Sequence, residues 1–347
     1  MEKIMSWFED LTGFREGSYE ETRAKLKVQK NRLISLENSK SFSIGKLELN
    51  ALQVFREKAT IANNISGKLK TSLVIGDVRS MHRAPENNGA LFQVASQFNL
   101  LEMTSPSITP EHSVTRYQND PTQGPACAIA TGAATIYRNY FIPLDGNRGQ
   151  TSDRQLDGLA DLGSALSNSI GLPVNDLWEM ENGYALASKT GLDAISKHLE
   201  SLAEVDKDFL REKLQVGLHS DVEVTDQTGS NAPIVSQLFY SALPMAYTGI
   251  PSIHWEAFSS LVLEAAYEAT MWADVLNAKR GASNVVFLTL LRGGAFGNQE
   301  SWIFSAIRRV LNLFTHFNID VRLVSFHTPS NACLLYTSDA ADDWFCV

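Results

Sequence analysis

A regular alternation of apolar and amphipathic stretches in the C-terminal part of the chain constrains its fold most strongly. Two stretches with helical spacing of their apolar residues cover His254–Ala278 and Glu300–Phe314. Short apolar runs that suit buried strands precede, separate and follow them, at Leu214–Val224, Pro233–Leu243, Asn284–Leu291 and Asp320–Phe326. Strands that alternate with helices in this way predict a sheet that carries helices on both faces.

The earlier part of the chain adds strands to this sheet. Apolar runs at Thr71–Val78 and Ala90–Met103 are typical of buried strands. The stretch Gly124–Tyr137 is rich in small residues, which suits either a helix packed closely on a sheet or a glycine-lined ligand loop that leads into a helix.

Two segments have a different character from this core. Residues 1–65 are predicted to be mainly helical, and Ser18 and Glu21 have the spacing of a capping box. Residues at about 145–213 are more polar and carry one hairpin signal, Asn182-Gly183. The predicted fold is therefore α/β: a three-layer α/β/α domain over 66–332, with an N-terminal helical extension and a helical insertion.

Composition excludes some classes of protein. The chain has 347 residues, 44% of them hydrophobic, which suits one large domain with an insertion. No apolar run reaches the 18 residues of a membrane-spanning helix, and Met1–Arg15 lacks the apolar stretch of a signal peptide. The formal net charge of -9 gives no electrostatic footprint for nucleic acid, and the basic stretch Arg23–Arg32 reads as a solvated helix face.

The end of the sequence and its cysteines bear on localisation. Cys333–Asp343 resembles the translation of a sequencing adapter, so residues 333–347 are predicted to be a non-native tail. Cys127 is then the single cysteine, which suits a reducing compartment and predicts an intracellular protein, cytoplasmic or nuclear. The scattered histidines form no ligand pair, and the sequence predicts neither a metal site nor a cofactor.

A glycine-rich turn is the strongest local indication of a ligand. Gly293, Gly294 and Gly297 lie between an apolar run and an amphipathic one, at the expected carboxyl end of a strand. Glycines let a ligand approach the backbone, and the N-terminus of the following helix favours a phosphate, with Asn298 as a possible cap. A tight connection without any ligand is the alternative. The stretch matches neither a P-loop nor a dinucleotide fingerprint.

Several motifs resemble those of macrodomains, in particular the branch of microbial poly(ADP-ribose) glycohydrolases. The run "LTLLRGGAFGN" is similar to their second ligand loop, and "LVIGDV" to an early strand that holds adenine. The run "FQVASQFN" resembles a strand whose last residue, Asn99, meets the distal ribose. The resemblance covers roughly residues 70–145 and 214–330, and it implies a macrodomain-like mixed sheet.

This resemblance also implies a set of ligand-binding residues. Gly76 and Asp77 would hold adenine, while Asn99 and the first loop, Gln123 to Ala126 with Gly124, would face the distal ribose. The second loop would wrap the diphosphate with Gly293, Gly294, Ala295, Phe296, Gly297 and Asn298. The chain departs from the pattern in two respects: no Gly-Gly-Gly loop follows Asn99, and no Glu-Glu pair follows the first loop.

Catalytic candidates follow from the chemistry of releasing ADP-ribose, which needs a group that directs water at an anomeric carbon. Asp120 is the first choice, with an Asx turn before Pro121 as the alternative. Gln123 is the second, with a plain loop residue as the alternative. Glu102 and Glu268 are further candidates, but Glu102 is expected rather to be a surface carboxylate, and Glu268 a helix-surface or structural residue.

The predicted function is binding of ADP-ribose, free or on an ADP-ribosylated protein, together with hydrolysis of ADP-ribosyl linkages. One alternative is a reader of ADP-ribose or a related nucleotide that lacks turnover. A second alternative is a cysteine-dependent hydrolase that uses Cys127, against which stands a buried structural cysteine. The sequence does not indicate an oligomeric state.

Overall fold

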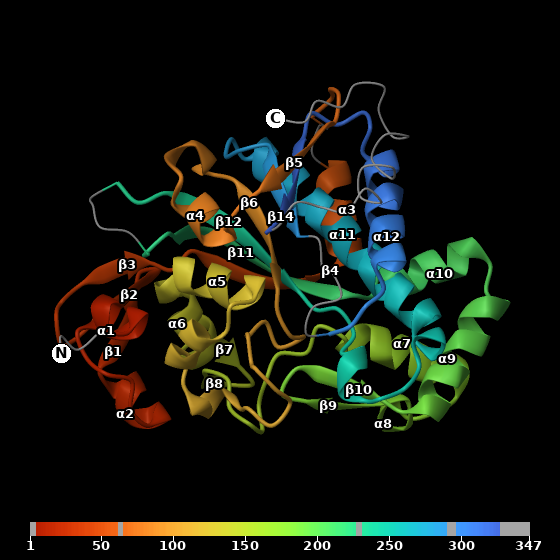
Figure 1. Cartoon of the computed structure of the whole chain (residues 1–347), viewed down its shortest axis with the longest axis horizontal. Coiled ribbons are helices and arrows are strands. Elements are labelled where there is room, and N and C mark those ends of the chain that lie inside the picture. Colours follow the sequence, from red (N-terminus) through yellow and green to blue (C-terminus); the bar gives the residue numbers. More distant parts are fainter. Residues whose placement is uncertain (1–4, 62–64, 227–230, 290–295, 327–347) are drawn as a thin grey trace.

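The computed structural model describes residues 5–61, 65–226, 231–289 and 296–326. Within these residues a seven-stranded mixed sheet forms the centre of the molecule, in the order β4-β11-β12-β6-β13-β14-β5 (Figure 1). In chain order its strands are β4 (Lys46–Ala51), β5 (Lys70–Ile75), β6 (Leu91–Ala95), β11 (Gln215–Glu223), β12 (Ile234–Tyr240), β13 (Val285–Thr289) and β14 (Asp320–Ser325).

Five neighbouring strands of this sheet, from β12 to β5, run parallel, whereas β11 and β4 are antiparallel to their neighbours. The carboxyl ends of all five parallel strands therefore lie at one edge. Leu91, Phe92 and Val94 of β6 are all buried, as expected for a central parallel strand that is covered on both faces.

Helices cover both faces of the sheet, which confirms the predicted three-layer α/β/α architecture (Figure 1). On one face lie α3 (Leu52–Ile61), α11 (Glu256–Lys279) and α12 (Glu300–Leu313), and on the other lie α4 (Val78–Arg83), α5 (Gln123–Ala130) and α6 (Gly132–Tyr140). The small residues of 124–137 thus form the two helices α5 and α6. Ala128, Ala130, Ala133 and Ala134 are fully buried there, because small side chains let these helices pack closely.

The N-terminal segment, predicted to be mainly helical, has three helices within its described residues and also four strands that the sequence does not lead one to expect. Besides α3 and β4 it consists of α1 (Trp7–Thr12), α2 (Tyr19–Ala24), β1 (Leu26–Gln29), β2 (Arg32–Ser35) and β3 (Ser41–Ser43). Strands β1 to β3 form a small antiparallel sheet, and β4 is an edge strand of the central sheet. The capping box is confirmed, because the Ser18 backbone N–H donates a hydrogen bond to the Glu21 carboxylate (3.2 Å).

Residues 145–213 form a mostly helical unit. It contains α7 (Ala160–Ile170), α8 (Val174–Leu177), β9 (Trp178–Glu181), β10 (Tyr184–Ala187), α9 (Lys189–Ser201) and α10 (Glu204–Arg211), after a short pair of strands, β7 (Pro143–Leu144) and β8 (Asn147–Arg148). The predicted hairpin turn is confirmed: Asn182 and Gly183 have φ angles of 47° and 82°, and they connect β9 to β10.

Short 3₁₀ turns complete the described structure, at η1 (Pro85–Asn87), η2 (Pro110–His112), η3 (Thr115–Asn119), η4 (Met245–Tyr247) and η5 (Ser252–His254). No helix of the described residues is long and apolar enough to cross a membrane. The predicted non-native tail, 333–347, lies outside the described residues.

Candidate functional site

A pocket of about 580 Å³ opens at the carboxyl ends of the five parallel strands. A residue that follows or ends each of these strands lines it: Gly76 after β5, Ser96 after β6, Ala242 after β12, Thr289 at the end of β13 and Phe326 after β14. This is the edge at which open α/β sheets bind their ligands, and the volume suits a molecule of nucleotide size.

Gln123, a predicted catalytic residue, lines the pocket and bridges two strands that separate there. Strand β13 pairs with β6 only at Val286 and Phe287. Beyond them the Gln123 side chain fills the gap: its Oε1 accepts the Ala95 N–H (2.9 Å), and its Nε2 donates to the Gln93 carbonyl (2.9 Å) and to Thr289 Oγ1 (3.0 Å). The carboxamide is therefore held by the protein itself, which favours a structural role over positioning of water.

The N-terminus of α5 forms one wall of the pocket. The helix begins at Gln123, and the Thr122 side chain makes no capping hydrogen bond. Thr122, Gly124 and Ala126 line the pocket, so the first turn of the helix faces it. Pro125 has no N–H, and the Ala126 N–H donates to the Thr122 carbonyl (3.3 Å). The N–H groups of Gln123 and Gly124 have no partner within the helix, so they are the donors that this wall offers, together with the partial positive charge of the helix end.

Gly124 lines the pocket, and the close packing of α5 on the end of β6 also requires a glycine at this position. A β-carbon at this position would lie 2.1 Å from the Ala95 carbonyl oxygen and 3.1 Å from Cγ of Glu102. The start of α5 therefore approaches the end of β6 more closely than any residue other than glycine would allow at position 124.

Glu102 is buried, so its expected position as a surface carboxylate is wrong. The residue is only 2% exposed and lines the pocket. Burial raises the pKa of Glu102 to about 7, although the Arg138 guanidinium 3.4 Å from its Oε1 opposes this rise. The other oxygen, Oε2, has no hydrogen-bond partner within the described structure. The preceding Leu100 and Leu101 are both buried, and this apolar pair is the feature of the sequence that could have indicated the burial of Glu102.

Asp120 lines the same pocket, and its carboxylate also makes the local hydrogen bond of an Asx turn. Asp120 Oδ1 accepts the Thr122 N–H (2.9 Å), across Pro121. The two interpretations of Asp120 are thus compatible, because one carboxylate oxygen suffices for the turn.

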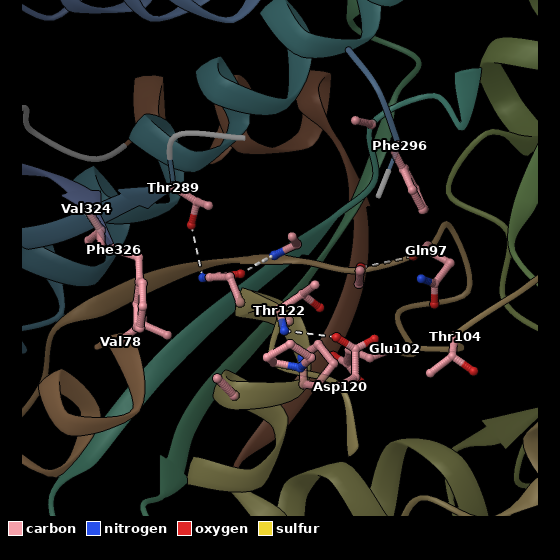
Figure 2. A pocket seen from close by; sticks show the side chains of 18 of the residues that line it. Val78, Gln97, Glu102, Thr104, Asp120, Thr122, Thr289, Phe296, Val324 and Phe326 are labelled. Carbon is pink, nitrogen blue, oxygen red and sulfur yellow. Dashed lines mark hydrogen bonds between the residues drawn. The ribbon is translucent and has the colours of Figure 1, made fainter. Parts of the chain in front are cut away.

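Figure 2 shows Val78, Val324 and Phe326 gathered at one side of the pocket, and Gln97, Thr104 and Phe296 at the other. Gly76 and Asp77, predicted to hold adenine, belong to the Val78 side. Asp77 caps α4, because its carboxylate accepts the N–H groups of Arg79 and Ser80 (both 3.1 Å) and the Ser80 hydroxyl (2.9 Å). Partial burial would raise the pKa of Asp77, but these hydrogen bonds hold it below its ordinary value.

The predicted diphosphate loop is only partly described. Gly293, Gly294 and Ala295 lie outside the described residues, whereas Phe296, Gly297 and Asn298 line the pocket. Asn298 does not cap the helix, since Gln299 holds the N-cap position of α12. Asn298 is 3% exposed, and its Nδ2 donates to the Leu243 carbonyl (2.8 Å).

Asn99, predicted to meet the distal ribose, is not among the residues that line the pocket. Strand β6 ends at Ala95, earlier than expected, and the chain then turns through Leu100 at a φ of 64°. Asn99 is fully buried beside the insertion, where its Nδ2 donates to Gln155 Oε1 (2.7 Å) and its Oδ1 accepts the Leu101 N–H (3.0 Å).

Three aromatic rings form one wall of the pocket, and of these the sequence predicted only Phe296 as a ligand-binding residue. Tyr184 comes from β10 of the insertion, Tyr247 from η4, and Phe296 from the loop before α12. Their ring centroids are 5.0 Å (Tyr184 to Tyr247), 5.3 Å (Tyr184 to Phe296) and 5.8 Å (Tyr247 to Phe296) apart. No sequence pattern could have joined them, because each follows a different element.

Cys127 lies outside the pocket lining and is fully buried. Burial raises the pKa of its thiol well above the ordinary value. A thiol that stays protonated is a poor nucleophile, so the structure favours a structural cysteine over the cysteine-dependent hydrolase.

The chain was compared with known proteins. No family model matches it, and no curated protein matches it in sequence. Among solved structures it is similar to poly(ADP-ribose) glycohydrolase from Thermomonospora curvata, with a TM-score of 0.45 and 11% identity over 90% of this chain and 94% of that one. The same enzyme from Deinococcus radiodurans, in complex with ADP-ribose, gives a TM-score of 0.45 and 10% identity over 85% of this chain and 93% of that one.

Proposed function

We propose that this protein binds the ADP-ribosyl group and hydrolyses the bond that joins its distal ribose to an acceptor, with an ADP-ribosylated protein as the substrate. The proposal rests on one observation: residues from three separate segments of the sequence line the same pocket. Gly76 with Asp77, Gln123 with Gly124, and Phe296 to Asn298 are far apart in the sequence, resemble separate macrodomain ligand motifs, and line one pocket.

The chemistry of the pocket suits the parts of ADP-ribose. Val78, Val324 and Phe326 give an apolar side for adenine, and Asp77 adds an acceptor for its amine. The first turn of α5 offers N–H donors and a positive helix end, which favour a diphosphate. The distal ribose then falls on the side of Glu102 and Asp120.

In the proposed hydrolysis, Glu102 acts as the general acid and Asp120 orients the attacking water. With a pKa of about 7, a large fraction of Glu102 is protonated at neutral pH and can donate a proton to the leaving atom. Asp120 accepts a hydrogen bond from the attacking water. The bond from C1″ to the acceptor breaks, the water oxygen bonds to C1″, and the acceptor leaves with a proton. Gln123, whose carboxamide is already engaged, keeps the strand ends apart.

The test is turnover of a protein that carries defined ADP-ribosyl linkages, measured for wild type, Glu102→Gln and Asp120→Asn. Asp153→Asn is the matched control, because Asp153 is not among the pocket residues and bonds to Thr151 instead. The proposal is supported if the wild-type protein releases ADP-ribose and if either pocket substitution lowers the rate of release at least ~100-fold. Tight binding of ADP-ribose without any release would instead indicate a reader. Full activity of both pocket variants would rule out the assigned carboxylates.

A further inference from the structure

We infer that the acceptor on the distal ribose is a cationic nitrogen group, a guanidinium or a pyridinium, and not a neutral hydroxyl. This inference rests on the proposed function, since it concerns the group that would lie beyond the distal ribose in the same pocket. It identifies the linkage as N-glycosidic.

The first observation is the aromatic wall of Tyr184, Tyr247 and Phe296. The rings are steeply inclined to each other, at 64° for Tyr184 and Tyr247 and 89° for Tyr247 and Phe296. Tyr184 is anchored, because its hydroxyl donates to the Met103 carbonyl. Tyr247 is 37% exposed, so part of its ring remains available to a ligand. Faces of aromatic rings attract cations, most strongly where water is excluded.

The second observation is the charge of the pocket. Among the described residues that line it are three carboxylates, Asp77, Glu102 and Asp120, and no lysine, arginine or histidine. Asp77 belongs to the side proposed for adenine, and its carboxylate also caps α4. Arg138 lies 3.4 Å from Glu102 and offsets part of its charge, so Asp120 is the main negative charge of the distal side. Burial raises the pKa of Tyr184 most, and the nearby charge of Asp120 adds to this rise.

The third observation is the free oxygen of Glu102. Oε2 is buried and has no partner within the described structure, although Glu102 lines the pocket. A buried acceptor without a partner is unfavourable, so the ionised form of Glu102 favours a ligand that donates a hydrogen bond to Oε2. A guanidinium that carries ribose on one nitrogen keeps four of its five N–H donors, and a pyridinium carboxamide offers two.

The chemistry balances for either acceptor. The C1″–N bond breaks and its electron pair stays on nitrogen, while the oxygen of water bonds to C1″. A pyridinium needs no proton to leave: it departs as the neutral pyridine, and the proton of water passes through Asp120 to solvent. A substituted guanidinium takes the proton of Glu102 on its leaving nitrogen and departs as guanidinium, and the proton of water then reprotonates Glu102 by way of Asp120.

Binding of matched dinucleotides tests the charge preference without any need for turnover. Oxidised nicotinamide adenine dinucleotide in its non-hydrolysable carbocyclic form carries a pyridinium, whereas the reduced dinucleotide has a neutral ring of nearly the same shape. We expect calorimetry to give a Kd at least ~5-fold lower for the cation. Tyr247→Leu should abolish that preference, whereas Tyr247→Phe should keep it.

Turnover separates the two sources of the cation. Peptides with ADP-ribose on arginine and on serine are compared with the hydrolysable oxidised dinucleotide. Cleavage of the arginine peptide assigns a guanidinium, and cleavage of the dinucleotide a pyridinium. Equal binding of the oxidised and reduced dinucleotides, or faster cleavage of the serine peptide, would overturn the inference. Failure to bind ADP-ribose at all would instead overturn the proposed function.

Discussion

At the scale of single residues, Glu102 and Asp274 are buried carboxyl groups with raised pKa values, but they differ in what surrounds them. Glu102 lines the pocket and lies beside Arg138. Asp274, on α11, is 0% exposed, and neither of its oxygens has a hydrogen-bond partner within the described structure. The raised pKa of Glu102 therefore suits a proton donor in catalysis, whereas the buried carboxyl group of Asp274 lowers the stability of the fold.

The pKa of Glu102 predicts the pH dependence of turnover. The proton donor is present below a pH of about 7 and is lost as the pH rises through this value. Turnover should therefore fall about tenfold per pH unit on the alkaline side. A pH profile of kcat measures this fall. An Asp120→Asn variant should retain its shape at a lower rate, and a wild-type profile that is flat between pH 6 and pH 9 would exclude Glu102 as the acid.

Asp274 predicts a pH dependence of stability. Burial raises the pKa of Asp274 well above its ordinary value, so the folded protein binds a proton that the unfolded chain releases. This group is most favourable below the unfolded pKa of about 4, and stability declines as the pH rises above that value. Asp274→Asn should raise the free energy of unfolding at pH 8 by about 1–3 kcal/mol, and by less at pH 5. Denaturant unfolding at the two pH values measures the difference; equal effects at both would contradict this account.

At the scale of elements, four helices meet in a cluster of ion pairs. Glu268 of α11 is 3% exposed and binds Arg56 of α3 (2.7 Å) and Arg309 of α12 (2.8 Å). Arg56 also binds Asp208 of α10 (2.8 Å), which joins the insertion to the core. Glu268 is thus a structural residue, one of the two roles that the sequence suggests for it.

Removing the charge of Glu268 should be costly, because it leaves two half-buried arginines without their shared carboxylate. Glu268→Gln is expected to lower the free energy of unfolding by about 3 kcal/mol. Glu200→Gln on α9, an exposed position, is the control and should change it by less than about 0.5 kcal/mol. Chemical denaturation measures both, and similar values for the two variants would mean that the cluster contributes nothing specific.

Prediction from sequence succeeded where an element is long and regularly patterned. The helix at 254–278 and the strands at 214–224 and 320–326 appear nearly as expected, because their apolar spacing reflects burial directly. It missed β1 to β3, which are only three or four residues long and contain polar or charged residues beside their apolar ones. Asn99 was misplaced for a similar reason: the apolar run continues beyond β6, and the turn at Leu100 carries no glycine or proline as a signal.

At the scale of the whole molecule, the site is assembled from both the core and the insertion. The core contributes Asp77, Asp120 and Phe296, and the insertion contributes Tyr184. The sequence located these core residues, because Asp77 and Phe296 lie in motifs that come after recognisable strands and Asp120 lies in a polar loop just before Gln123. Tyr184 and the burial of Glu102 depend on how distant segments pack, which a local pattern does not encode.

The insertion also shares the main hydrophobic cluster with the core. Leu162, Leu177 and Ile195 are fully buried in the same cluster as Phe258 and Val262 of α11. We therefore expect one cooperative transition in calorimetric unfolding, with equal calorimetric and van't Hoff enthalpies. Two resolved transitions would show that the insertion folds as a separate unit.

The central claim is that the pocket at the carboxyl ends of the strands binds ADP-ribose, and calorimetric titration of the folded protein tests it most directly. We predict one site with a micromolar Kd. Phe326→Ala should weaken it about tenfold, because stacking on a base is worth about 1–3 kcal/mol, whereas Phe209→Ala, which is outside the pocket lining, should leave it unchanged. The absence of any binding to folded wild-type protein would contradict the account.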